Sequence, residues 1–135
     1  MAVTRFEDLE VWQASRAFCR EIGSVLRRPC FRADFPVWQQ LNAAAISTVA
    51  NIAEGFLRNT PREFTRYLRI AAGSNGEVRA LVYVAKDRGY LASIEFHRLV
   101  DSTNAIGRML RALEQRAAKA ASRFAPPRND PNCKG

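Results

Sequence analysis

Residues 93–122, SIEFHRLVDSTNAIGRMLRALEQRAAKAAS, are the longest amphipathic stretch of this 135-residue chain. Apolar or small side chains recur there at alternating steps of three and four residues, and the series runs Phe96, Leu99, Thr103, Ile106, Leu110, Leu113, Ala117, Ala120 and, just beyond the stretch, Phe124. This spacing places one such side chain on the same helical face at every half-heptad. A seam this narrow and this long predicts a helix that packs lengthwise against other helices.

Three further amphipathic segments precede this one, at about residues 9–28, 36–58 and 61–88. Pro29 ends the first, because proline cannot continue a helix, and Cys30 to Phe35 is expected to be a loop. The run Thr60-Pro61-Arg62-Glu63 starts the third segment with a cap, a proline at the first helical position and the glutamate of a capping box. Gly89 is expected to end that segment as a left-handed cap.

The segment 61–88 contains Gly73-Ser74-Asn75-Gly76, which allows two interpretations. One is a turn that divides two short helices, and the other is a single helix with small residues at a close crossing. The apolar seam keeps the same phase on both sides, which favours one unbroken helix. Segment 36–58 is rich in alanine, so it is predicted to lie centrally, where neighbouring helices approach closely.

The predicted fold class is therefore all-α. Because the connections are short, consecutive helices should run antiparallel, as an up-down-up-down four-helix bundle over residues 1–122. Residues 123–135, which are basic and contain proline, are expected to form a disordered tail. The helices also carry more apolar surface than one interior stripe requires, including a second seam on 61–88. This excess predicts subunit contacts and hence a homo-oligomer.

The composition points to a basic protein, with 21 Lys and Arg against 13 Asp and Glu and a net charge of +8. Nearly all the cations are arginines, whose planar guanidinium binds phosphate or carboxylate bidentately. The surplus favours RNA or DNA as a partner, and the alternatives are a solvated surface, an acidic protein or a membrane surface. No apolar stretch is long enough to span a bilayer and no CxxC pair is present, so we expect a cytoplasmic protein and no membrane partner.

Four ordered motifs resemble a known family. They are Phe6-Glu7-Asp8-Leu9-Glu10-Val11-Trp12, Ala50-Asn51-Ile52-Ala53-Glu54-Gly55, Glu63-Phe64-x-Arg66-Tyr67-Leu68-x-Ile70-Ala71-x-Gly73-Ser74-x-x-Glu77 and Ala85-Lys86-Asp87-x-Gly89-Tyr90-Leu91. They are similar to the bacterial four-helix-bundle proteins encoded by intervening sequences within large-subunit ribosomal RNA genes. That family resembles the accessory variability determinants of diversity-generating retroelements, which are basic pentameric barrels that bind nucleic acid and a reverse transcriptase.

The resemblance implies a ring-like homopentamer without enzyme activity, which could meet RNA, DNA or a polymerase-type protein. Two departures from the family bear on binding, and one is the proline-rich tail from Ala125, which is not part of the family pattern. The segment 36–58 opens with Trp38-Gln39-Gln40-Leu41 where relatives often carry Gln-Ile-Arg-Arg, so a basic cluster is missing there.

Two groups of cations are the candidate nucleic-acid-binding residues. Arg62, Arg66 and Arg69 share one helical face, and Arg58 lies just before them. The second group is Arg108, Arg111, Arg116, Lys119 and Arg123, which Glu114 alone opposes in that part of the chain. For both groups the alternative is a solvated helix face, with Arg66 paired to Glu63.

Polar residues also fall on or beside the apolar seams, and we expect them to form a hydrogen-bonded network that fixes the register of the helices. Its members are Asn51, Glu54, Glu63, Tyr67, Ser74 and Glu77. The single histidine, His97, has Ile94 rather than a glutamate three residues before it, which argues against a di-metal site. We predict no catalytic residue, no metal and no cofactor. The rival to nucleic-acid binding is a purely structural protein–protein interaction module, for example one accessory to a polymerase or reverse transcriptase.

Overall fold

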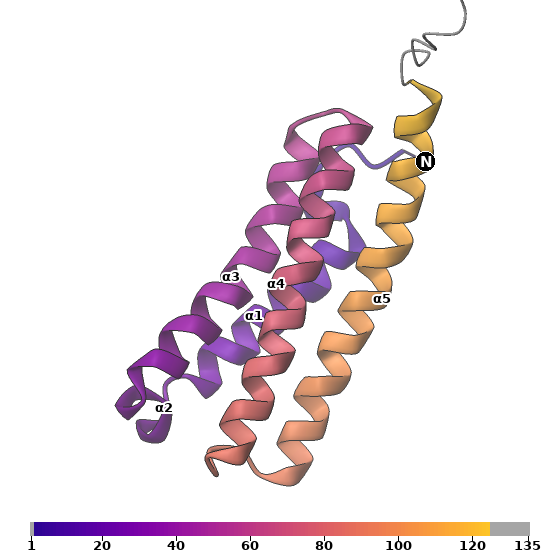
Figure 1. The fold of residues 1–135 in the computed structure, drawn as a ribbon. Helices are drawn as coiled ribbons and strands as arrows, with labels where there is room; N and C mark the ends of the chain where they lie inside the picture. Colours follow the sequence, from indigo (N-terminus) through magenta and orange to yellow (C-terminus); the bar gives the residue numbers. More distant parts are fainter. Residues whose placement is uncertain (1, 125–135) are drawn as a thin grey trace, which may run out of the picture.

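The computed structural model describes residues 2–124, which fold into helices and contain no strand. A 3-10 turn, η1 (Phe6–Asp8), precedes five α-helices, as Figure 1 shows. These are α1 (Glu10–Val25), α2 (Pro29–Ala33), α3 (Phe35–Leu57), α4 (Pro61–Asp87) and α5 (Ser93–Arg123). The prediction of an all-α chain is confirmed for this part of the sequence.

The long helices lie side by side, and α4 packs along both α3 and α5. The chain reverses direction between α3 and α4 and again between α4 and α5, so each pair is a helical hairpin (Figure 1). Helix α1 packs mainly on α3 and makes fewer contacts with α5. The start of α4 therefore lies beside the end of α5, an arrangement that matters for the candidate site.

Both ends of α4 follow from local sequence. At its start, Thr60 Oγ1 accepts a hydrogen bond from Glu63 N at 3.2 Å, and Pro61 occupies the first turn. At its end, Gly89 adopts a positive φ of 79°, Tyr90 N donates to Ala85 O at 3.0 Å, and the helix closes in a Schellman motif. Between these ends the helix runs through Gly73–Gly76 without interruption.

The prediction of a loop from Cys30 to Phe35 is wrong in part, because α2 occupies Pro29–Ala33. Helix α1 ends at Val25, three residues before the predicted end at residue 28. Pro29 starts α2, since its fixed φ suits the first helical position. Phe31 anchors this short helix, because its side chain is fully buried and its ring lies 5.3 Å from that of Tyr90.

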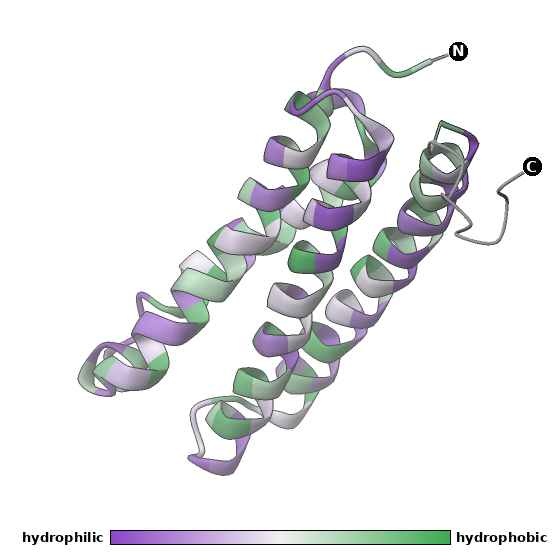
Figure 2. Cartoon of the chain, turned by 45° about the horizontal axis from the view of Figure 1, so that its top comes forward, coloured by the Kyte–Doolittle hydropathy of each residue, from purple (hydrophilic) through white to green (hydrophobic). Residues whose placement is uncertain are grey.

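The core is formed by one face of each long helix. On α5 the predicted seam is buried from Phe96 to Leu110, but Leu113 is only half-buried and Phe124 is 79% exposed. The seam thus fails at its last position, because α5 has 31 residues against 27 in α4 and its final turns have less to pack on. Hydrophobic and hydrophilic residues alternate along the helices, as Figure 2 shows.

Across residues 2–124, none of the helices combines the length and the hydrophobicity that crossing a bilayer requires. Of the predicted tail 123–135, Arg123 ends α5 and Phe124 follows it, and the rest lies outside the described residues.

Candidate nucleic-acid interface

The surplus positive charge of the described chain lies on two neighbouring segments, which contain the first half of α4 and the second half of α5. Residues 58–73 and 105–124 together contain nine cationic side chains and two acidic ones, Glu63 and Glu114. The remaining described residues contain ten of each sign, so they are balanced. The nine are the predicted binding residues, Arg58, Arg62, Arg66, Arg69, Arg108, Arg111, Arg116, Lys119 and Arg123. We call the surface formed by these nine residues the cationic end.

Contacts between α4 and α5 bring the two groups of cations together. Arg69 Nε lies 2.7 Å from Glu114 Oε1 across the two helices. Nearer the middle of the two helices, Asn75 Nδ2 donates a hydrogen bond to Thr103 O at 2.9 Å. These contacts fix the register, so residues 58–73 of one hairpin arm face residues 105–124 of the other.

Two cations, Arg58 at the end of α3 and Arg66 on α4, flank an aromatic ring. The guanidinium carbons of Arg58 and Arg66 each lie 5.4 Å from the centroid of the Tyr67 ring. Arg58 also pairs with Glu54 at 3.0 Å, and Arg66 pairs with Glu63 at 3.5 Å. These arginines are about half exposed or more, and exposed ion pairs contribute only about 0–1 kcal/mol. Their charges therefore remain available to an anionic ligand.

The α5 cations are less compensated. All five are exposed, and none forms an ion pair with any residue in 2–124. The single acidic residue among them, Glu114, is engaged by Arg69. The acidic residues of η1, Glu7 and Asp8, belong to an element that packs on α1 and α3.

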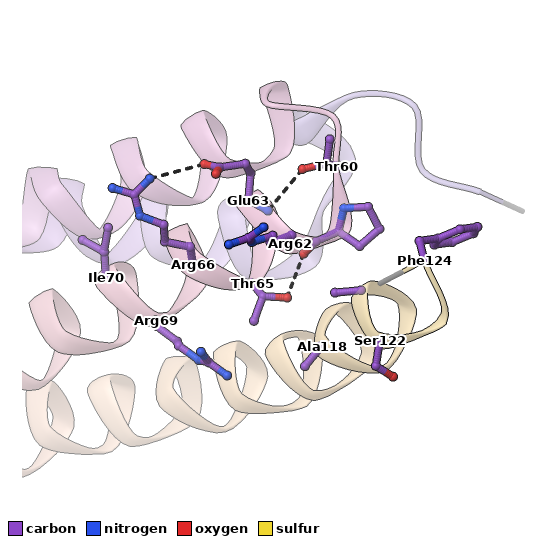
Figure 3. A pocket seen from close by; sticks show the side chains of 12 residues that line it. Thr60, Arg62, Glu63, Thr65, Arg66, Arg69, Ile70, Ala118, Ser122 and Phe124 are labelled. Atoms are coloured by element: carbon purple, nitrogen blue, oxygen red, sulfur yellow. Dashed lines mark hydrogen bonds and ion pairs between the residues drawn. The ribbon is translucent and has the colours of Figure 1, made fainter. Parts of the chain in front are cut away.

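A groove of about 1190 Å³ separates the start of α4 from the end of α5, and Figure 3 shows its lining. Arg62, Arg66 and Arg69 line the α4 side, whereas small residues and Phe124 line the α5 side. The hydroxyl of Thr65, also in the lining, donates to Pro61 O at 2.8 Å within its own helix. The groove thus combines positive charge with apolar surface.

The model of the 23S rRNA-intervening sequence protein family matches residues 7–112. The chain belongs to this family. A solved structure of a protein of unknown function from the S23 ribosomal protein family of Bacteroides thetaiotaomicron is similar in fold, with a TM-score of 0.71 and 18% identity over 78% of this chain and 98% of that one. Among curated proteins, none matches the chain.

The family match contains only part of the cationic end. Arg58, the three α4 arginines of this surface, Arg108 and Arg111 lie inside residues 7–112. Arg116, Lys119 and Arg123 lie beyond it. The α5 wall of the groove, which includes Ala118 and Ser122, also lies beyond the match. The groove is thus built partly from residues inside the family match and partly from residues of α5 beyond it.

The predicted polar network separates into two groups. Asn51 Nδ2 donates to Ser47 Oγ at 2.9 Å, and Ser47 Oγ lies 2.8 Å from Ser74 Oγ, which joins α3 to α4. Glu54, Glu63 and Tyr67 belong instead to the arginine cluster described above. Ser47 was not predicted to belong to this network. Its position one helical turn before Asn51 could have indicated that the two side chains meet.

Glu77 joins neither group. It is exposed and makes no hydrogen bond with residues 2–124, and it lines a shallow hollow beside Ser47 and Ser74. Within these residues, no three His, Cys, Asp or Glu side chains lie close enough together to hold a metal ion.

Two carboxylates with perturbed pKa values lie elsewhere, in ion pairs between helix ends. Asp34 accepts hydrogen bonds from Tyr90 Oη at 2.7 Å and Arg88 Nη1 at 2.6 Å, and these two donors lower the pKa of its carboxyl. A hydrogen bond from Arg28 lowers the pKa of Glu95 in the same way. Such shifts keep both groups ionised and suit structural ion pairs rather than acid–base chemistry.

Proposed function

We propose that this protein is a non-enzymatic, basic helical module that binds nucleic acid through its cationic end. The observation that carries the proposal is the distribution of charge: nine cations against two acids on two neighbouring helix segments, with the rest of residues 2–124 balanced. A phosphate backbone presents closely spaced negative charges, so it complements a surface of clustered arginines. The family is named for an intervening sequence of 23S rRNA, which makes RNA the first ligand to test.

We further propose that the subunit is an up-down-up-down bundle that assembles into a ring, with five copies as the expected number. Support comes from α3, which has no charged residue between Phe35 and Ala53 although a quarter of the chain is charged. Its outer face nevertheless exposes Phe35, Ile46 and Leu57 by half or more. An exposed apolar face of this length favours contact with another copy, and a ring would gather several cationic ends.

Salt dependence tests the nucleic-acid proposal. Binding of a labelled RNA strand and of an RNA duplex is measured by fluorescence anisotropy at 50 and 200 mM salt. If six or more phosphates are contacted, affinity for the preferred ligand should fall by about 10³-fold or more over this range. Absence of binding at low salt, or an affinity that does not change with salt, would reject the proposal.

Charge-reversal variants locate the surface. The double variant Arg108→Glu and Arg111→Glu should weaken binding by at least about tenfold, because each contact to a phosphate contributes to the salt-dependent term. The matched control is Arg20→Glu with Arg27→Glu, which changes the net charge equally at two exposed arginines outside the cationic end. Equal losses in the two variants would mean that net charge, not this surface, governs binding.

A further inference from the structure

We infer that the groove between the start of α4 and the end of α5 takes an unpaired nucleic-acid strand in preference to a duplex. This inference rests on the proposed function and narrows its ligand. It follows from the mixed chemistry of the groove. Its α4 wall carries three arginines together with Glu63 and Ile70, and its α5 wall is mainly apolar.

The α4 wall supplies the contacts for phosphate. Arg62, Arg66 and Arg69 follow one another along this wall at spacings of four and three residues (Figure 3). Arg62 makes no ion pair with any residue in 2–124. Arg66 and Arg69 each make one, but both arginine side chains remain about two-thirds exposed. Three guanidiniums in a line suit successive phosphates of one strand.

The α5 wall supplies apolar surface, which a duplex cannot use well. Ala118, Ala121 and Phe124 line it. In a duplex the flat faces of the bases are stacked inside the helix, so a protein surface meets mainly phosphate and sugar. An unpaired strand presents phosphates together with free base faces, which lie well on apolar and aromatic side chains. The groove offers partners for both.

Phe124 is the candidate stacking platform. Its side chain is 79% exposed, and its ring makes no aromatic pair with residues 2–123. It stands at the end of α5, where the groove opens (Figure 3). Tyr67, the neighbouring aromatic residue of α4, is already flanked by Arg58 and Arg66. Phe124 is therefore the aromatic face at this end that is open to a base.

The size of the groove suits a strand rather than a single nucleotide. Its volume of about 1190 Å³ exceeds the range of about 300–1,000 Å³ typical of small-ligand pockets. Arg111 precedes Ala118 and Ser122 by seven and eleven residues, which places it on the same side of α5 and extends the cationic line. A strand that passes Phe124 can thus continue toward Arg111.

The test compares one labelled RNA strand of about 20 nucleotides with the same strand annealed to its complement. The wild-type protein should bind the single strand at least about tenfold more tightly than the duplex at equal salt. Phe124→Ala should weaken single-strand binding by about 5- to 150-fold, which corresponds to the loss of one stacked base. It should leave duplex binding within about twofold and leave the salt slope unchanged, because no charge is removed.

The matched control is Ile94→Ala, which truncates another exposed apolar residue, 86% accessible, at the opposite end of α5. This variant should change neither the affinity for the single strand nor the affinity for the duplex. Equal binding of strand and duplex by the wild type, or full single-strand affinity in Phe124→Ala, would overturn the inference while the proposed function survives. Failure of the wild type to bind either ligand would instead defeat the proposed function, and the inference with it.

Discussion

Gly55 shows how one missing side chain sets the spacing of two helices. It is buried on α3, and a Cβ atom built there would lie 2.5 Å from Tyr67 Cβ and 3.2 Å from Phe64 Cδ2 on α4. Both distances are shorter than ordinary van der Waals contact, and the first involves an atom attached directly to the backbone. The close approach of α3 and α4 therefore depends on glycine at this position.

Replacement of this glycine should separate the helices or strain them. We expect Gly55→Ala to lower the free energy of unfolding by about 1–3 kcal/mol, the usual cost of overpacking. Gly73→Ala is the matched control, since a Cβ at this exposed position of α4 would meet no atom within 4 Å. It should raise stability by about 0.5–1 kcal/mol through helix propensity. Urea denaturation measures both, and a stable Gly55→Ala would mean that the crossing is looser than described.

At this scale the sequence indicated the local pair of Arg66 with Glu63 but not the ion pairs between helices. Helical spacing alone places Arg62, Arg66 and Arg69 on one face of a helix. That Arg69 reaches Glu114, 45 positions away, depends on the register of two helices, which one sequence does not reveal. The exposure of Phe124 was missed for a similar reason, because periodicity cannot tell where a neighbouring helix ends.

At the scale of elements, prediction succeeded where periodicity was long. The unbroken helix α4 follows from a seam that keeps its phase across Gly73–Gly76. Helix α2, with five residues, is too short to show a period. On α1 the buried face includes Val11, Ser15 and Phe18, whereas Trp12 and Cys19 are only half-buried. The adjacent positions of several apolar residues left the rotation of α1 ambiguous.

The ends of elements are joined by an ion pair whose stability depends on pH. Asp34, between α2 and α3, contacts Arg88 and Tyr90 in the turn that links α4 to α5. These donors hold the pKa of Asp34 below its ordinary value of 3.8. A group whose pKa is lower in the folded state stabilises the fold at pH values above its pKa in the unfolded chain. This stabilisation is lost as the pH falls through the pKa of the group in the folded state.

We therefore expect Asp34→Asn to be less stable than the wild type at pH 7 and to lose less of its stability between pH 5 and pH 3. Urea midpoints at the three pH values measure this. Asp101→Asn is the control, because Asp101 is exposed and makes no ion pair with residues 2–124. The stability that Asp101→Asn loses between pH 5 and pH 3 should equal the loss in the wild type. An equal loss in Asp34→Asn would show that the ion pair of Asp34 does not contribute to stability.

At the scale of the whole molecule, composition predicted a basic protein but not where the charge lies. The surplus becomes a surface only because the hairpin places residues 58–73 beside 105–124. Short connections made that juxtaposition predictable in outline. The groove was not predictable, since its volume depends on how far α5 continues past the start of α4.

The uncharged face of α3 bears on assembly. If copies contact each other there, the native mass should be a multiple of 15.2 kDa, five times that value for the expected ring. Ile46→Arg, which places a charge on this face where Ile46 is 50% exposed, should lower the native mass without loss of helicity, because it would bury a charge in the contact. Light scattering and circular dichroism measure the two properties.

Ile94→Arg serves as the control for that variant, since it adds the same charge at an exposed residue of α5. It should assemble as the wild type does. A wild-type chain that stays at its single-subunit mass at micromolar concentration would contradict self-association altogether. Unchanged mass in Ile46→Arg would place the contact on another face.

The uneven distribution of charge over the molecule has an electrical consequence. Because the positive surplus lies on neighbouring segments of α4 and α5, the centre of positive charge is displaced toward that side of the chain. In the field of a polyanion this displacement produces a torque, which turns the arginine-rich side forward before any contact is made. A protein with the same net charge spread evenly would be attracted but not oriented, so more of its encounters would begin with the wrong side leading.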